Sequence, residues 1–185
     1  MPTSASVCDF GWSPPGFVLE GIDGGCHALA DVAGPNGTLV MFLCNHCPYV
    51  RAIERKIARD ARDLAALGIG VAAICSNDAE AYPDDAPDGL RAQSRRASFD
   101  FPYLVDADQS VARNWGAVCT PEFFGFGAAT GLQYRGRLDA SGMRGGADEL
   151  RRDLFEAMRQ VARTGRGPAG QVPSLGCSIK WKTAT

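Results

Sequence analysis

The pattern of apolar residues in the first third of the chain predicts a buried strand followed by an amphipathic helix. Residues 39–43 are five consecutive apolar side chains, which is typical of a strand that is buried on both faces. From Val50 onward the apolar residues recur every three or four positions with charged residues between them, as on a helix with one buried face. Pro48 suits the first turn of that helix, where a missing N–H costs no hydrogen bond. We therefore expect a strand to lead directly into a helix around residues 44–48.

A second apolar run completes a βαβ unit and predicts an α/β domain. Gly68 ends the helix, and residues 69–74 predict another buried strand. Two strands joined by a helix in this way are expected to be parallel, with a right-handed crossover. The further elements are expected in chain order as an N-terminal hairpin of 17–19 and 26–29 about the turn Asp23-Gly24-Gly25, an acidic loop over 77–87, an arginine-rich helix from Asp88, a short strand at 101–105, a helix over 106–116, an antiparallel hairpin of 123–126 and 132–137, and an amphipathic helix over 148–163.

The tail of the chain is less regular. Residues 165–185 contain two prolines, so no regular element is expected there before residues 177–181. Those last residues are more patterned than a frayed end should be, and we expect the tail to pack on the rest of the protein. The chain is interpreted as a single domain over 1–185, with a core over about 17–164 and the tail packed against it.

Composition and charge narrow the function classes. The chain has 185 residues, 45% hydrophobic and 22% charged, with a formal net charge of −2, which gives no reason to expect nucleic acid or an anionic membrane as a partner. Residues 1–17 lack the charged and apolar regions of a signal peptide, and no apolar run is long enough to cross a bilayer. A cytoplasmic location is therefore expected. Seven cysteines, an odd number, fit reduced thiols better than a paired set of disulfides.

Two cysteines separated by two residues lie where the buried strand meets the helix. The first turn of a helix presents unpaired N–H groups and the positive end of the helix dipole, which stabilise a thiolate. We therefore expect the pKa of Cys44 to fall below the ~8.5 of a free thiol. Cys44 would then attack a disulfide as the nucleophile, and Cys47 would resolve the mixed disulfide. His46, between them, is expected to stabilise the Cys44 thiolate further; the alternative is that it only caps the helix.

The other candidate side chains favour structural roles. Cys75 ends the second buried strand and is expected to pack as a small core residue. Cys8, Cys26 and His27 do not have the spacing of a metal site. The acidic loop over 77–87 is expected to be solvated, because prolines interrupt it and its spacing is not that of a calcium loop.

The order of these motifs resembles that of the thioredoxin fold. In that fold a βαβ unit with CxxC at its turn is followed by a Thr-Pro pair that leads into a ββα unit, and this chain has Thr120-Pro121 at that place. The resemblance implies an α/β, thioredoxin-like fold with a central mixed sheet flanked by helices. It also implies a cis peptide bond before Pro121, with Pro121 beside Cys44 and with Thr120 as a binding contact for extended substrate backbone.

A narrower resemblance covers the chain from about Phe17 to Lys182. The N-terminal hairpin, and the insertion after the second buried strand, are similar to the alkyl hydroperoxide reductase/thiol-specific antioxidant branch of the thioredoxin superfamily. Four stretches resemble bacterial peroxiredoxin-like thioredoxin family proteins, namely CNHCPYV at 44–50, SNDAEAYP at 76–83, AVCTP at 117–121 and GCSIKWK at 176–182.

The sequence departs from both families at two places. Thioredoxins carry a buried acid in the strand before the CxxC, whereas residues 38–43 contain none, so Glu122 or a water molecule is a candidate to take the proton of Cys47. Peroxiredoxins carry Thr or Ser three residues before the peroxidatic cysteine and Pro four residues before that. Counted back from Cys47, those places hold Cys44 and Val40, so the peroxide pocket is not evident in this sequence.

Three functions remain open. The first is a thiol-disulfide oxidoreductase that uses Cys44 and Cys47, needs no cofactor, and exchanges electrons with disulfides of proteins or small molecules, a reductase or glutathione being candidate partners. The second is a peroxiredoxin-like thiol peroxidase with antioxidant activity, in which Cys47 or Cys44 reacts with a hydroperoxide. The third is a binding protein in which Cys44, His46 and Cys47 hold a soft metal such as Zn²⁺ or Cu(I).

Two further thiols are candidates for an auxiliary role. Cys119 precedes Pro121 by two residues, so the fold would place it near the CxxC. If the tail packs back on the domain, Cys177 can act as an extra resolving or ligand thiol. The alternative is a tail that Ile179 and Trp181 anchor for packing only.

Overall fold

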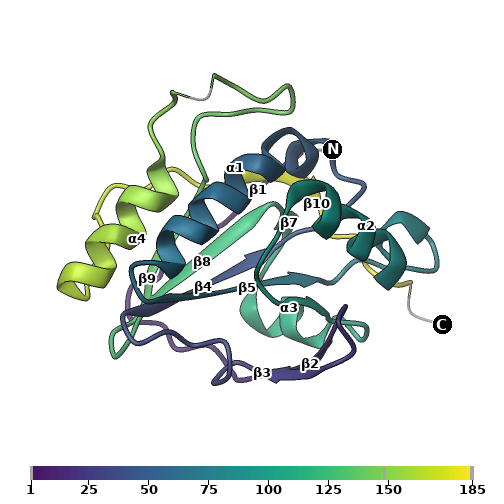
Figure 1. Cartoon of the computed structure of the whole chain (residues 1–185), viewed down its shortest axis with the longest axis horizontal. Coiled ribbons are helices and arrows are strands. Elements are labelled where there is room, and N and C mark those ends of the chain that lie inside the picture. The colour runs from purple at the N-terminus through teal and green to yellow at the C-terminus, as the bar shows by residue number, and fades with distance from the viewer. Residues whose placement is uncertain (1, 148, 184–185) are drawn as a thin grey trace.

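The computed structural model describes residues 2–147 and 149–183, and its main feature is a seven-stranded mixed sheet (Figure 1). The strands of this sheet are β2 (Val18–Gly21), β3 (Cys26–Ala28), β4 (Gly37–Phe42), β5 (Ile69–Cys75), β6 (Tyr103–Val105), β8 (Glu122–Gly127) and β9 (Gly131–Gly136). The helices are α1 (Pro48–Ala65), α2 (Pro87–Ala97), α3 (Ser110–Trp115) and α4 (Asp153–Thr164), with a short 3-10 helix, η1, at Pro83–Asp85.

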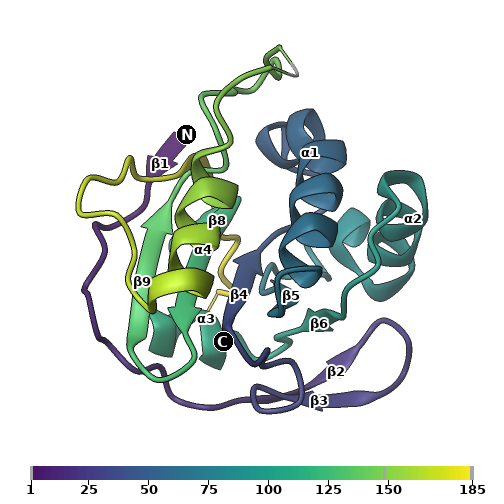
Figure 2. The same cartoon turned by 60° about the vertical axis from the view of Figure 1, so that its left-hand side comes forward.

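The strands lie in the order β3-β2-β6-β5-β4-β8-β9, and the three central ones are parallel. Leu39 of β4 pairs with Val71 of β5, as expected for two strands joined by the crossover helix α1. β8 pairs antiparallel with β4 and β9 pairs antiparallel with β8, and the β2–β3 hairpin forms the other edge of the sheet (Figure 2). The predicted mixed sheet with a parallel central pair is therefore confirmed.

Helices cover both faces of the sheet, and the alternation of side chains along the strands divides the core into two parts. Leu39 and Met41 of β4 point to the face that α1, α2 and α4 cover, whereas Val40 and Phe42 point to the face that α3 covers (Figure 1). All of β4 is buried, which explains why its sequence is a continuous apolar run.

Aromatic rings fill the α3 side of the core. The ring of Trp115 lies 5.7 Å from that of Phe124 and 6.1 Å from that of Phe42, in edge-to-face arrangements that suit the ring quadrupoles. Phe17 and Phe126 complete the cluster at 5.9 and 5.5 Å from Trp115. This cluster fixes α3, and with it the segment that leads into residues 117–121.

A small second sheet joins the two ends of the chain. It consists of β1 (Pro2–Ser4), β10 (Leu175–Ser178) and β7 (Cys119–Thr120), all antiparallel, with β10 in the middle. Ile179, directly after β10, is buried in the α3 side of the core. The tail thus lies against the domain at the segment that enters β8.

Several boundaries differ from those expected. The helix expected over 106–116 begins only at Ser110, because the carboxylate of Asp106 accepts hydrogen bonds from the N–H groups of Val111 and Ala112 and the preceding residues form a turn. The helix expected to begin at Asp148, a residue outside those described, begins at Asp153. There the N–H of Leu154 donates to the carbonyl of Leu138 and ties the first turn to the segment after β9.

Two further boundaries concern the ends of the chain. The patterned tail forms a strand at Leu175–Ser178, two residues earlier than expected, and β1 was not predicted.

Within the described residues, no helix combines the length and the apolar character needed to cross a membrane.

Phe124→Ala should lower the free energy of unfolding by about 3–5 kcal/mol, because the ring is fully buried in the aromatic cluster and its loss leaves a cavity. Urea denaturation followed by tryptophan fluorescence measures this change. The matched control is Phe10→Ala, since the Phe10 side chain is 47% exposed and should contribute no more than about 0.5 kcal/mol. Equal losses in the two variants would contradict the described core.

Candidate active site

Cys44 and Cys47 lie in the turn between β4 and α1, at the carboxyl end of a central parallel strand. Cys47 is the N-cap residue of α1, and Pro48 occupies the first helical position, where it gives up no hydrogen bond. Both sulfur-bearing side chains are fully covered, with 0% of each residue exposed. The turn therefore presents two thiols at a helix start, but within the protein and not on its surface.

Thr120 lies opposite both thiols. The peptide bond between Thr120 and Pro121 is cis. The sulfur of Cys44 is 3.1 Å from the hydroxyl oxygen of Thr120, and the sulfur of Cys47 is 3.2 Å from the carbonyl oxygen of Thr120. The structure therefore brings Cys44, Cys47 and the Thr-Pro pair together, although they are more than 70 residues apart in the sequence.

His46 contacts an acid from the loop after β5. Its Nδ1 lies 2.5 Å from Oδ2 of Asp85, and because a carboxylate can only accept, the ring donates its Nδ1–H there. The ring also stacks on Tyr82 at 4.9 Å between centroids. His46 therefore contacts this carboxylate, and its expected role in stabilising a Cys44 thiolate stays a prediction.

Asp85 is a site residue that sequence reasoning missed. It is only 1% exposed, and it accepts four hydrogen bonds, from the backbone N–H of Asn45, the backbone N–H and ring of His46, and the side-chain amide of Asn77. The expectation of a solvated acidic loop is therefore wrong at this position. No pattern in the sequence separates Asp85 from its neighbour Asp84, whose side chain is 67% exposed.

The pKa values of Cys44 and Cys47 shift in the order opposite to the one expected. A hydrogen bond from Cys44, and more weakly contacts from Cys177 and the backbone N–H of Val50, lower the pKa of Cys47 to about 5 against the opposing effect of burial. Burial, the hydrogen bond to Cys47 and the nearby charge of Asp85 raise the pKa of Cys44 well above its ordinary value. This order of pKa values is the reverse of the one expected, because Cys44 donates a hydrogen bond to Cys47 and so favours ionisation of Cys47.

Glu122 and Cys119, which the sequence suggested for this site, contact groups other than Cys44 and Cys47. Glu122 is fully buried, and its carboxylate pairs with the guanidinium of Arg135 and accepts from the N–H groups of Val118 and Cys119. These contacts point Glu122 away from a role as proton acceptor for Cys47. Burial and Glu122 raise the pKa of Cys119, whose sulfur lies 3.8 Å from Glu122.

Cys75 is buried in the core, as predicted.

Cys177 of β10 reaches the site from the tail. Its sulfur lies 2.9 Å from that of Cys47, and its residue pairs with Thr120 in the small sheet. Thr120, which the thioredoxin resemblance implies as a contact for substrate backbone, therefore already has a strand of the same chain beside it.

Cys44, His46 and Asp85 are residue types that can bind a metal ion, but the carboxylate of Asp85 already accepts hydrogen bonds. One ligand atom each from Cys44, His46 and Asp85 lie within 4.8 Å of one another. Both oxygens of Asp85 already accept two hydrogen bonds each, so a metal ion would have to displace these donors. The cluster does not establish a metal site.

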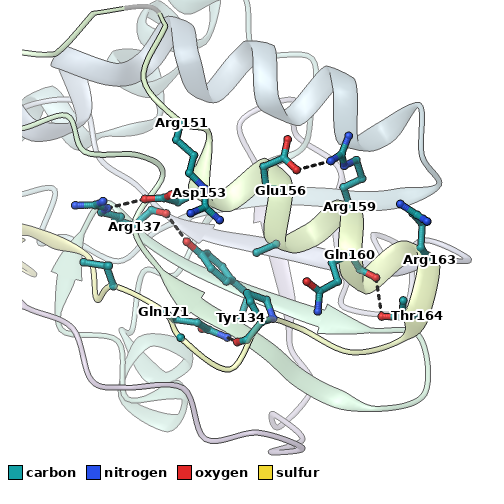
Figure 3. Close-up of a pocket in the computed structure, with 14 residues that line it drawn as sticks. Tyr134, Arg137, Arg151, Asp153, Glu156, Arg159, Gln160, Arg163, Thr164 and Gln171 are labelled. Atoms are coloured by element: carbon teal, nitrogen blue, oxygen red, sulfur yellow. Dashed lines mark hydrogen bonds and ion pairs between the residues drawn. The ribbon is translucent and has the colours of Figure 1, made fainter.

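Two cavities differ in whether they adjoin the candidate site. One, of about 350 Å³, adjoins the site: Tyr49, Pro121, Leu138 and Leu175 are among the residues that line it. The other, of about 450 Å³, lies between α4, β9 and the tail (Figure 3). None of the seven cysteines lines the second cavity, and its ion pairs, Arg137 with Asp153 and Arg159 with Glu156, leave it mixed in charge.

A family model agrees with this arrangement. Residues 11–138, which include the CxxC turn and the Thr-Pro pair, match the AhpC/TSA family. The chain belongs to the AhpC/TSA family. This confirms the resemblance to the alkyl hydroperoxide reductase/thiol-specific antioxidant branch. No curated protein sequence matches this AhpC/TSA family member.

Two solved structures are similar along the whole chain. One is an uncharacterized conserved protein from Geobacillus kaustophilus, with 36% identity and a TM-score of 0.93, covering 100% of this chain and 98% of that one. The other is a hypothetical protein from Sinorhizobium meliloti 1021, with 38% identity and a TM-score of 0.91, covering 98% of both chains. This AhpC/TSA family member thus shares its full architecture with both of these proteins.

A more distant structure identifies the fold. It is a putative thioredoxin from Neisseria meningitidis, with 22% identity and a TM-score of 0.62, covering 82% of this chain and 90% of that one. The expected thioredoxin-like fold, with its central mixed sheet flanked by helices, is confirmed.

The reactivity of Cys47 should follow a low-pH titration. Because a pKa of about 5 leaves the thiolate as the main form above that pH, alkylation of Cys47 by iodoacetamide should fall as pH decreases through about 5 and stay nearly level from pH 6 to 8. Mass spectrometry of the alkylated peptide, together with thiolate absorbance at 240 nm, measures this titration. The absorbance change should vanish in Cys47→Ser and persist in Cys26→Ser; a reactivity that rises only above pH 8 would contradict the assignment.

Proposed function

We propose that this protein is a thiol-disulfide oxidoreductase whose reacting groups are Cys44 and Cys47. The observation that carries the proposal is the meeting of both sulfurs at Thr120, beside the cis peptide bond, with Cys47 favoured as the thiolate. A thiolate is the attacking form in thiol–disulfide exchange, and a second thiol within reach is needed to release the product. Disulfides of proteins or small molecules are the proposed substrates.

The proposed reaction has two steps. The thiolate of Cys47 attacks a substrate disulfide, forms a mixed disulfide and expels one substrate thiolate. The thiol of Cys44 then attacks the sulfur of Cys47, closing a Cys44–Cys47 disulfide, and its proton passes to the second substrate thiolate as it leaves. This order reverses the roles expected from the sequence, because the structure favours ionisation of Cys47 and opposes that of Cys44.

Asp85 and His46 act as positioning residues in this proposal. Asp85 accepts the backbone N–H groups of Asn45 and His46, so it holds the turn between the two cysteines. The side-chain amide of Asn45 donates to the carbonyls of Asp84 and Gly89, which ties the same turn to η1 and α2. A turn fixed in this way keeps both sulfurs at Thr120 and limits the rearrangement needed between the two steps.

A thiol peroxidase is the second candidate, because a thiolate at a helix start in an AhpC/TSA family member is also suited to a hydroperoxide. The Cys47 thiolate would attack one peroxide oxygen, giving a sulfenic acid and an alkoxide or hydroxide that takes up a proton. Cys44 would then condense with the sulfenic acid to a disulfide, and water would leave. Against this stand Cys44 and Val40, which occupy the positions of the peroxidatic Thr or Ser and Pro.

Turnover assays separate these functions. Reduction of insulin or of glutathione disulfide, with dithiothreitol as the electron source, should fall by about a hundredfold or more in Cys47→Ser, because the attacking sulfur is lost. Cys44→Ser should slow turnover, because the Cys44–Cys47 disulfide can no longer close. Hydrogen peroxide replaces the disulfide in a parallel assay.

The control variant is Cys26→Ser, since Cys26 is exposed on β3. It should keep full turnover. Equal activity of Cys47→Ser and the unmodified protein would contradict both redox functions, and consumption of peroxide without any disulfide reduction would select the peroxidase.

A further inference from the structure

The tail strand β10 places a third sulfur at the candidate active site. Cys177 pairs with Thr120 across the small sheet, and its sulfur lies 2.9 Å from that of Cys47. Thr120 is also the residue that both CxxC sulfurs contact. Three thiols from two distant parts of the sequence therefore meet around one residue.

The neighbouring glycine allows this close approach. A β-carbon added at Gly176 would lie 2.1 Å from the carbonyl oxygen of Thr120 and 3.0 Å from the nitrogen of Pro121, far inside contact distance. Any other residue at this position would push β10 away from the Thr120–Pro121 peptide. The backbone of β10 thus lies directly against the substrate-facing segment implied by the thioredoxin fold.

Hydrogen bonds hold the strand on both sides of Cys177. Before it, the hydroxyl of Ser174 donates to the carbonyl of Gly136. After it, the N–H of Ile179 donates to the carbonyl of Val118, and the N–H of Lys180 donates to the side-chain oxygen of Asn77. With Ile179 also buried in the core, displacing β10 would break several buried contacts at once. The strand β10 is therefore a fixed part of the site and is not held loosely over it.

Exposure distinguishes the three thiols. Cys44 and Cys47 are fully covered, whereas Cys177 is partly exposed. Burial and the hydrogen bond with Cys47 raise the pKa of Cys177 to about 12, and the same contact lowers the pKa of Cys47.

We propose that Cys177 is a second resolving thiol, which attacks the mixed disulfide on Cys47 and forms a Cys47–Cys177 disulfide. This inference rests on the proposed function. The Cys177 thiol bonds to the sulfur of Cys47, the bond from Cys47 to the substrate sulfur breaks, and the proton of Cys177 leaves with the substrate as a thiol. Cys44 then attacks Cys47, releases Cys177 as a thiol and closes the Cys44–Cys47 disulfide. Two electrons pass to the substrate and each sulfur is accounted for.

The test traps the first of these disulfides. In Cys44→Ser, stoichiometric glutathione disulfide should convert Cys47 to a Cys47–Cys177 disulfide and leave little glutathione on the protein. In Cys44→Ser/Cys177→Ser, the mixed disulfide of Cys47 with glutathione should accumulate instead, at least about tenfold more than in the single variant. Trypsin cleaves after Arg51, Arg166 and Lys180, so the expected disulfide joins peptide 1–51 to peptide 167–180. Fragmentation of the joined peptides shows which cysteine is linked.

Matched variants exclude trivial explanations. Cys26→Ser, in the Cys44→Ser protein, should keep the joined peptides, and Cys47→Ser should abolish them. Gly176→Ala should reduce their yield by moving β10, whereas Gly170→Ala, in the same tail but with open space at its β-carbon, should not. If Cys177 stays free and glutathione accumulates equally with and without it, the tail has a packing role only and the inference is wrong.

The trapping result separates this inference from the proposed function. Loss of turnover in Cys47→Ser, together with a Cys177 that never forms a disulfide, would refute the second resolving thiol and leave the oxidoreductase intact. A Cys47–Cys177 disulfide in a protein that reduces neither disulfides nor peroxide would refute the oxidoreductase.

Discussion

The contacts of Thr120 are the constraint on which the candidate site depends. Its hydroxyl faces Cys44, its carbonyl oxygen lies 3.2 Å from the sulfur of Cys47, and its backbone pairs with the strand that carries Cys177. One residue next to a cis peptide bond thus sets the positions of three sulfurs. The aromatic cluster around Trp115 fixes the segment that leads to Thr120, so the packing on the far face of the sheet also determines the geometry of the thiols.

A buried carboxylate holds the other side of the site. A charge as well covered as that of Asp85 is tolerated only with strong hydrogen bonds, and here four donors face its two oxygens. Three of these donors, two backbone N–H groups and the ring of His46, belong to the turn between Cys44 and Cys47, and the fourth comes from Asn77 after β5. The same carboxylate that orders the turn also opposes the ionisation of Cys44, which leaves the negative charge on Cys47. Structural order and the choice of thiolate therefore have a common cause.

The parts of the fold that depend on local patterns could be predicted from the sequence. The buried run over 39–43, the helical period from Val50 and the parallel pairing of β4 with β5 follow from apolar spacing and chain connectivity. The parts that could not be predicted depend on contacts between distant residues. Asp85 and Asp84 look alike in the sequence, and only the folded loop buries one of them. The pKa order of the two thiols likewise follows from burial and from Cys177, neither of which the spacing of a CxxC motif contains.

The small sheet has a consequence for the beginning of the chain. β10 has β7 on one side and β1 on the other, and Pro2 of β1 pairs directly with Cys177. The first residues are therefore only one strand away from the sulfur of Cys47. Any partner, modification or added segment that pulls on the N-terminal strand would act on the position of the third thiol, so this end of the protein is mechanically coupled to its reactive centre.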